Sequence, residues 1–127
     1  MSGRTLVTIT IVVMIAAVAA GTWVLGSPTA ARRLRFDEMR VDDLTALVRA
    51  VDHRRSVSNR LPDTLAELTR DSSVLDLQDP ATAQPYEYRV VSADSYHLCA
   101  VFQRPSPTGA TSWRHGSGRH CFTLHSR

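Results

Sequence analysis

The fold of the C-terminal part of this chain is indicated most clearly by residues 86–102, which read YEYRVVSADSYHLCAVF. Residues 86–91 alternate apolar and polar side chains, as a half-buried strand does, and residues 96–102 form a second run rich in β-formers. The small residues Ser92, Ala93 and Asp94 between them are typical of a tight turn. The stretch therefore predicts an antiparallel hairpin.

The sequence after this hairpin predicts a third strand and a disulfide. Residues 103–118 are a loop rich in Pro, Gly and Ser, and residues 120–124 form the strand. Cys99 and Cys121 each lie in a strand-like run, and an even pair in a small domain is typical of a disulfide. Closing the loop would stabilise the fold by about 3 kcal/mol in the chain-entropy model. Disulfides persist outside the cytoplasm, so the pair favours an outer location.

The sequence before the hairpin predicts an amphipathic helix over residues 37–55. Its apolar side chains recur three and four apart and form one stripe: Val41, Leu44, Leu47, Val48 and Val51. Acidic residues would lie in its first turns, as the helix dipole favours: Asp37, Glu38, Asp42 and Asp43. We expect the stripe to pack on the sheet. This gives an α+β fold with one amphipathic helix on about three antiparallel strands.

A second, short helix is predicted to begin at Pro62, where a missing N–H costs nothing. Leu61, Leu65 and Leu68 would hold it against the first helix. Residues 71–83 are polar and predict irregular structure, with a turn at Asp79 and Pro80.

The N-terminal segment predicts a transmembrane helix. Residues 5–25 contain no charge, and a helix of that length rises about 31 Å, close to a bilayer core. We therefore divide the chain into an anchor at 1–26, a linker at 27–35 and a body at 36–127. Small residues gather in the second half of the span, where another helix could approach closely: Ala16, Ala17, Ala20 and Gly21. The alternative is a signal peptide cleaved near residues 17–19, but the apolar run continues to Leu25, which favours a retained anchor.

The orientation of the span is indicated by two opposing features. Arg32, Arg33, Arg35 and Arg40 follow it and would by themselves keep the body in the cytoplasm. The cysteine pair favours the other side, and long domains translocate largely regardless of charge. We expect a single-pass protein of a bacterial inner membrane with its C-terminal domain on the periplasmic side.

Charge is unevenly distributed along the chain. The formal net charge is +3, and all 12 acidic residues lie within 37–94. The basic C-terminal third is either a solvated face or a contact surface for anionic lipid headgroups or an acidic partner. The candidate contact residues are Arg104, Trp113, Arg114 and Arg119. Trp113 is alternatively a plug that covers the disulfide. Nucleic acid is not expected as a partner, because no binding motif accompanies the charge.

The order of these features resembles a pseudopilin-like fold. The relevant residues are Leu61-Pro62-x-x-Leu65-x-x-Leu68, then Asp79-Pro80 and Pro85-Tyr86-x-Tyr88 at the start of the hairpin. They are similar to the LPxxLxxL segment and DPxGxPYxY hairpin of the major pseudopilins of type II secretion. Small bacterial single-span membrane proteins ending in YxLCAxF…W…H…CF look closer still. The resemblance covers most of residues 36–124 and implies a fold. Prepilins carry Glu at the fifth position after the processing-site Gly, whereas Thr8 stands there after Gly3.

No residue pattern in the sequence predicts catalysis or a cofactor. His115, His120, Cys121 and His125 are the one metal-like group, and they lack the closely spaced ligand pairs that zinc uses. We expect a non-enzymatic accessory subunit that stabilises a larger membrane protein complex, a bioenergetic one being an option. The alternatives are a pseudopilin-like component of a secretion or pilus machine and a membrane-anchored ligand-binding or sensing module.

Overall fold

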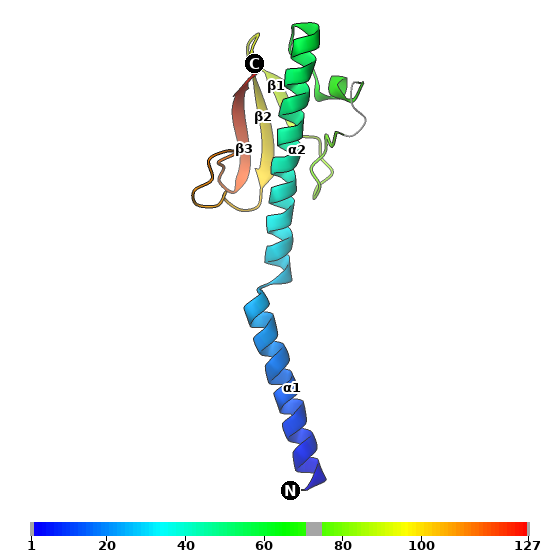
Figure 1. Cartoon of the computed structure of the whole chain (residues 1–127), viewed down its shortest axis with the longest axis vertical. Coiled ribbons are helices and arrows are strands. Elements are labelled where there is room, and N and C mark those ends of the chain that lie inside the picture. The colour runs from blue at the N-terminus through cyan, green and yellow to red at the C-terminus, as the bar shows by residue number, and fades with distance from the viewer. Residues whose placement is uncertain (1, 71–74, 127) are drawn as a thin grey trace. The chain divides into compact units, whose positions relative to one another are not determined.

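The chain forms two compact units in the computed structural model, which describes residues 2–70 and 75–126. The units are Met1–Arg32 and Arg33–Arg127. Figure 1 labels the elements in chain order: α1 (Gly3–Leu25), α2 (Pro28–Ser58), the 3₁₀ helix η1 (Leu65–Arg70), β1 (Glu87–Val90), β2 (Ser95–Phe102) and β3 (Gly118–His125). The predicted division into anchor, linker and body stays a prediction. The residues assigned to the linker, 27–35, are helical from Pro28 onward.

The first unit is built around α1, whose apolar side chains are exposed along its length. The helical stretch that contains it is long and apolar enough to cross a membrane, by length and composition. Thr8 and Thr10 donate their hydroxyls to the carbonyl oxygens of Arg4 and Leu6, which satisfies these polar groups within the helix. The helix ends at Leu25 because Gly26 adopts a φ of 72°, which glycine tolerates best.

The amphipathic helix α2 begins at Pro28, so the prediction that it begins at Asp37 is wrong. Proline suits the first turn of a helix, and the Ala, Arg and Leu residues that follow it are good helix formers. Asp37 therefore lies well inside the helix, and its predicted dipole contact in a first turn is wrong as well. The end at Ser58 lies slightly beyond the predicted residue 55.

The predicted hairpin and third strand are confirmed as one antiparallel sheet in the order β1-β2-β3. Glu87 pairs with Cys99, and Cys99 pairs in turn with Cys121, so one register row crosses all three strands. The turn is closed by the backbone N–H of Val91, which donates to the carbonyl oxygen of Ser95 at 2.9 Å. Strand β3 runs from Gly118 to His125 and is longer than residues 120–124.

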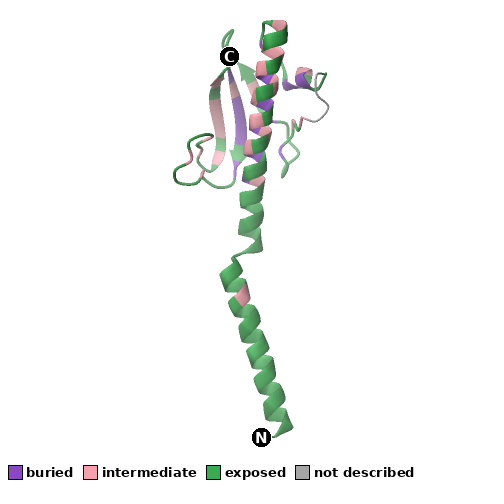
Figure 2. Ribbon diagram, in the orientation of Figure 1, coloured by how far each residue is buried: buried purple, intermediate pink, exposed green. Residues whose placement is uncertain are grey.

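The core lies between α2 and one face of the sheet, where Figure 2 shows buried residues on both elements. Its members come from the helix stripe, from β2 and from the segment between them: Leu44, Leu47, Val51, Leu61, Leu65, Leu68, Tyr86, Tyr96, Leu98, Ala100 and Phe102. The three leucines after α2 join this core as predicted. The short helix among them is a 3₁₀ helix that begins at Leu65 instead of Pro62. Residues 71–74 of the predicted irregular segment lie outside the described residues.

Candidate functional site

A buried ion-pair network is centred on Arg40 of α2. The guanidinium donates through Nε and Nη2 to both carboxylate oxygens of Asp79, the second bond being 3.0 Å long, and through Nη1 to Asp37 at 2.7 Å. Two backbone N–H groups, of Ala81 and Thr82, also donate to Asp79 at 2.9 Å. Burial by itself raises the pKa of Asp79, but these donors outweigh it and hold the pKa below its ordinary value.

Asp37 connects this network to the long loop between β2 and β3. Its two carboxylate oxygens accept the backbone N–H groups of Gln103 and Arg104 at 3.0 and 2.9 Å. One buried carboxylate thus binds Arg40 on its own helix and the first loop residues of the neighbouring strand. The loop is thereby fixed against α2 at the point where it leaves the sheet.

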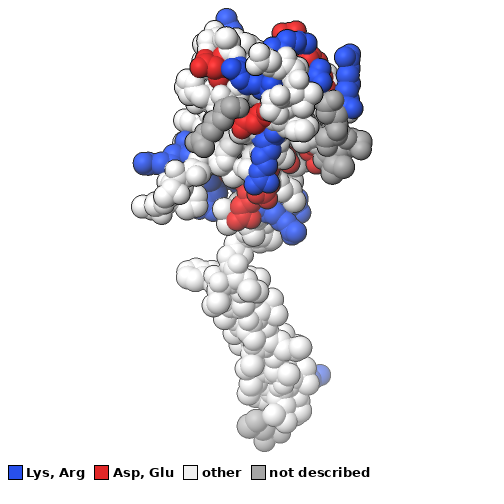
Figure 3. Space-filling model, turned by 45° about the horizontal axis from the view of Figure 1, so that its top comes forward, with Lys and Arg blue, Asp and Glu red and all other residues white. Residues whose placement is uncertain are grey.

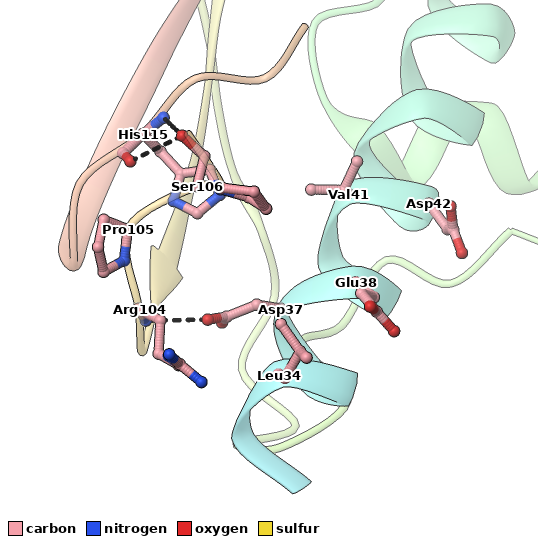
Figure 4. A pocket seen from close by; sticks show the side chains of 10 residues that line it. Leu34, Asp37, Glu38, Val41, Asp42, Arg104, Pro105, Ser106 and His115 are labelled. Carbon is pink, nitrogen blue, oxygen red and sulfur yellow. Dashed lines mark hydrogen bonds between the residues drawn. The ribbon is translucent and has the colours of Figure 1, made fainter. Parts of the chain in front are cut away.

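A groove of about 210 Å³ lies between α2 and this loop. Figure 4 shows the two walls, which we call the helix wall and the loop wall. The helix wall consists of Leu34, Asp37, Glu38, Val41 and Asp42. The loop wall consists of Arg104, Pro105, Ser106, Pro107 and His115. The groove therefore combines apolar side chains with charges of both signs.

The loop wall is preformed by contacts within the loop. The backbone N–H of Ser106 donates to the carbonyl oxygen of His115 at 2.9 Å, and the backbone N–H of His115 donates to Ser106 Oγ at 3.2 Å. The His115 ring stacks on Phe102, with ring centroids 3.5 Å apart. His115 Nδ1 lies 3.0 Å from the carbonyl oxygen of Gly116.

Asp43, which follows the groove residue Asp42 in sequence, has an unusual charge environment. Burial raises the pKa of Asp43, and the nearby Asp76, Asp42 and Asp79 add to the effect, although the Tyr86 hydroxyl donates to its carboxylate at 2.7 Å. Burial likewise raises the pKa of Tyr86, and the Asp43 charge raises it further. Asp42 and Asp43 thus have different surroundings, since Asp42 is exposed and Asp43 is half-buried.

Of the four predicted contact residues, Trp113 and Arg119 have side-chain partners in the body, and Arg104 and Arg114 do not have one among the described residues. Trp113 is half-buried against the core, edge-on to Phe122 at 4.8 Å, and donates Nε1–H to Thr45 Oγ1 at 3.0 Å. Arg119 forms a two-bond ion pair with Glu87 on the sheet. Arg104 and Arg114 are exposed, and neither side chain has a partner within residues 2–70 and 75–126. The geometry of Trp113 fits the alternative that it is a plug, although it covers Phe122 and not the disulfide.

The predicted disulfide forms between Cys99 and Cys121, which lie directly opposite each other on β2 and β3. The Arg119 guanidinium lies over it, with Nη2 3.7 Å from Cys99 Sγ. The bond and the Glu87–Arg119 pair occupy the sheet face opposite the one covered by α2. Within the described residues, no group of three His, Cys, Asp or Glu side chains is arranged to hold a metal ion.

The predicted helix-packing residues lie in α1. Ala16, Ala17 and Ala20 are exposed and Gly21 is partly exposed in the isolated chain. An added Cβ at Gly21 would meet no atom within 4 Å. This surface is therefore open to a neighbouring helix.

The Asp37–Arg40–Asp79 network was not predicted from the sequence, although part of its signal is present there. Counting back four and seven residues from Leu44 along the buried stripe gives Arg40 and Asp37. Charged residues at apolar-stripe positions indicate a buried ion pair, which the stripe alone could have suggested. We found no family model that matches the chain, and no curated protein or solved structure that matches it.

Proposed function

We propose that this protein is a membrane-anchored, non-enzymatic accessory subunit that stabilises a larger membrane protein complex. The observation that carries the proposal is α1, a helix of 23 residues without a buried side chain. An apolar surface of that size is stable in lipid or against another protein, and not in water. The cysteines, His115 and the charged residues around Arg40 have structural contacts in the body. They form the disulfide, a ring stack on Phe102 and the buried ion-pair network.

The membrane in question is the inner membrane of a bacterium, with the body on the periplasmic side. A disulfide in a body of this size supports an oxidising compartment. The hydroxyls of Thr8 and Thr10 are satisfied within α1, which suits a helix in lipid.

A direct test replaces the small residues that we expect at the helix interface. Ala17→Leu with Gly21→Leu should release the protein from its complex. Helices in lipid are held together by close packing, and the larger leucine side chains would keep the two helices apart. The matched control, Val12→Leu with Val13→Leu, changes apolar residues in the other half of the span. Co-purification in mild detergent measures the result. Wild-type yield of the same partners with the first variant would make α1 a passive tether.

Two other functions are supported by specific observations. The burial of Leu61, Leu65 and Leu68 in the core, followed by the hairpin, supports a pseudopilin-like fold and hence a component of a secretion or pilus machine. The groove beside α2 supports a ligand-binding or sensing module. Its volume of about 210 Å³ is below the roughly 300 Å³ at which small-molecule pockets begin, so this groove would take only a small ligand.

A further inference from the structure

Three arginines of the second unit have exposed side chains: Arg33 and Arg35 at its start, and Arg104 in the loop that follows β2. None of them has a side-chain hydrogen bond or ion pair with the described part of the chain. Leu34 lies between the first two in sequence and shares the groove with Arg104. Figure 4 shows Arg104 and Leu34 at the same end of the groove. Residues far apart in sequence thus bring a cationic surface to one end of the body.

The carboxylate of Asp37, which shares the groove with Arg104, is engaged by other groups. Asp37 is buried, and its oxygens are occupied by Arg40 and by the backbone N–H groups of Gln103 and Arg104. Glu38 and Asp42 also belong to the helix wall, but Figure 4 shows both directed to the side of α2 turned away from Arg104. Figure 3 shows basic and acidic side chains mixed on the face of the body in view.

Apolar side chains accompany the three arginines. Leu34 is 42% exposed, and Pro105 and Pro107 are exposed on the loop wall. A surface that combines guanidinium groups with apolar side chains matches the headgroup region of a bilayer, where phosphates lie next to ester and acyl groups.

The covalent chain keeps this surface near the end of α1. Arg33 follows Leu25 by eight residues, which span at most about 28 Å even when fully extended. Most of them are helical, which shortens that reach, since a helix rises only about 1.5 Å per residue. The bound depends on chain length alone and holds for any arrangement of the two units.

We propose that Arg33, Arg35 and Arg104 bind the headgroups of anionic phospholipids at the membrane surface, with Leu34 and the loop prolines beside them. The proposal rests on the membrane anchoring proposed above and adds the lipid class. Asp37 has a defined part in it, because its carboxylate holds the loop that presents Arg104.

The test uses the full chain in nanodiscs of phosphatidylcholine, with or without phosphatidylglycerol. Hydrogen exchange is measured at the backbone N–H groups of residues 103–111, of which Pro105 and Pro107 have none. We expect exchange several-fold slower with phosphatidylglycerol, and a smaller difference at high salt because ions screen the contact. Replacing Arg33, Arg35 and Arg104 with Gln should remove the difference. The matched control, Arg49→Gln, Arg70→Gln and Arg89→Gln, removes three exposed arginines elsewhere and should retain it.

Each contrary result has a separate meaning. Equal exchange of the wild-type loop in both lipids would overturn the headgroup proposal and leave the surface to an acidic protein. Equal slowing by inorganic phosphate in phosphatidylcholine discs would assign the arginines to a free anion, and an equal loss in the control variant would assign the effect to net charge. Failure of the chain to enter nanodiscs would overturn the anchoring itself, and the headgroup proposal with it.

Discussion

Arg40 and Asp79, which lie 39 residues apart in sequence, form a buried ion pair that joins α2 to the segment before β1. Arg40 is 1% exposed and Asp79 is 7% exposed. Both are also satisfied by further partners, Asp37 on one side and the N–H groups of Ala81 and Thr82 on the other. A pair of this kind is costly to break, because the remaining charge stays buried without its counterion.

Asp79→Asn should therefore lower the free energy of unfolding by about 3 kcal/mol. The amide retains an oxygen for the neighbouring N–H groups but loses the charge that faces Arg40. Chemical denaturation in detergent, followed by tryptophan fluorescence, measures the change. Asp63→Asn is the control, because its ion pair with Arg60 is exposed and should contribute less than about 0.5 kcal/mol. Equal effects of the two substitutions would contradict the assigned role of Arg40.

Asp43 should make stability depend on pH in the opposite direction to Asp79. Burial and the neighbouring acids raise the pKa of Asp43 in the folded state, so the folded state binds its proton more readily than the unfolded state. The ionised carboxylate therefore opposes folding at neutral pH, and this opposition disappears as pH falls below the ordinary value of 3.8.

Asp43→Asn should accordingly raise the free energy of unfolding at pH 7. The Tyr86 hydroxyl can still donate to the amide oxygen, so the hydrogen bond is retained. The advantage over the wild type should shrink as the pH approaches about 3, where the wild-type carboxyl is also neutral. Denaturation series at several pH values measure the difference. A constant difference across the pH range would show that charge is not its cause.

The sequence predicted the parts of the fold that depend on local periodicity. The stripe around Leu44, the hairpin and the cysteine pair each follow from spacing or composition within a short window. The start of α2 differs from the prediction because residues 27–35 contain a proline, which favours a linker, whereas a proline in a first helical turn is equally consistent with a helix start.

The groove could not be predicted from the sequence, because it depends on contacts between distant residues. Asp37 binds backbone groups 66 and 67 residues further along the chain. A backbone N–H leaves no trace in residue identity, so composition could not indicate where the loop attaches. The candidate site therefore required the structure, apart from Arg104, which the basic C-terminal third already contained.

Trp113 offers a test of its position in the fold. Thr45→Val removes the acceptor of its indole N–H while keeping the side-chain volume, and should destabilise the body by about 1 kcal/mol. Trp113→Ala should cost about 2–3 kcal/mol, since the half-buried ring also packs against Phe122. A double-mutant cycle measures the coupling of the two residues. Additive effects would mean that the hydrogen bond is not formed in solution.

The Cys99–Cys121 disulfide links stability to the compartment of the body. Its two residues are 22 positions apart, and constraining such a loop in the unfolded chain stabilises the fold by about 3 kcal/mol. Cys99→Ala with Cys121→Ala should remove that amount and make the unfolding midpoint insensitive to reductant, whereas the wild-type midpoint should fall when reductant is added.

The same bond tests the location of the body in cells. Cells are quenched with acid, and free thiols are alkylated before mass spectrometry. A periplasmic body should show both cysteines protected from alkylation, because thiols are oxidised there and kept reduced in the cytoplasm. Lysate reduced before alkylation is the control and should show both cysteines modified. If the cysteines of unreduced cells were modified to the same extent, the body would lie in the cytoplasm, and the arginines that follow α1 would have set its orientation.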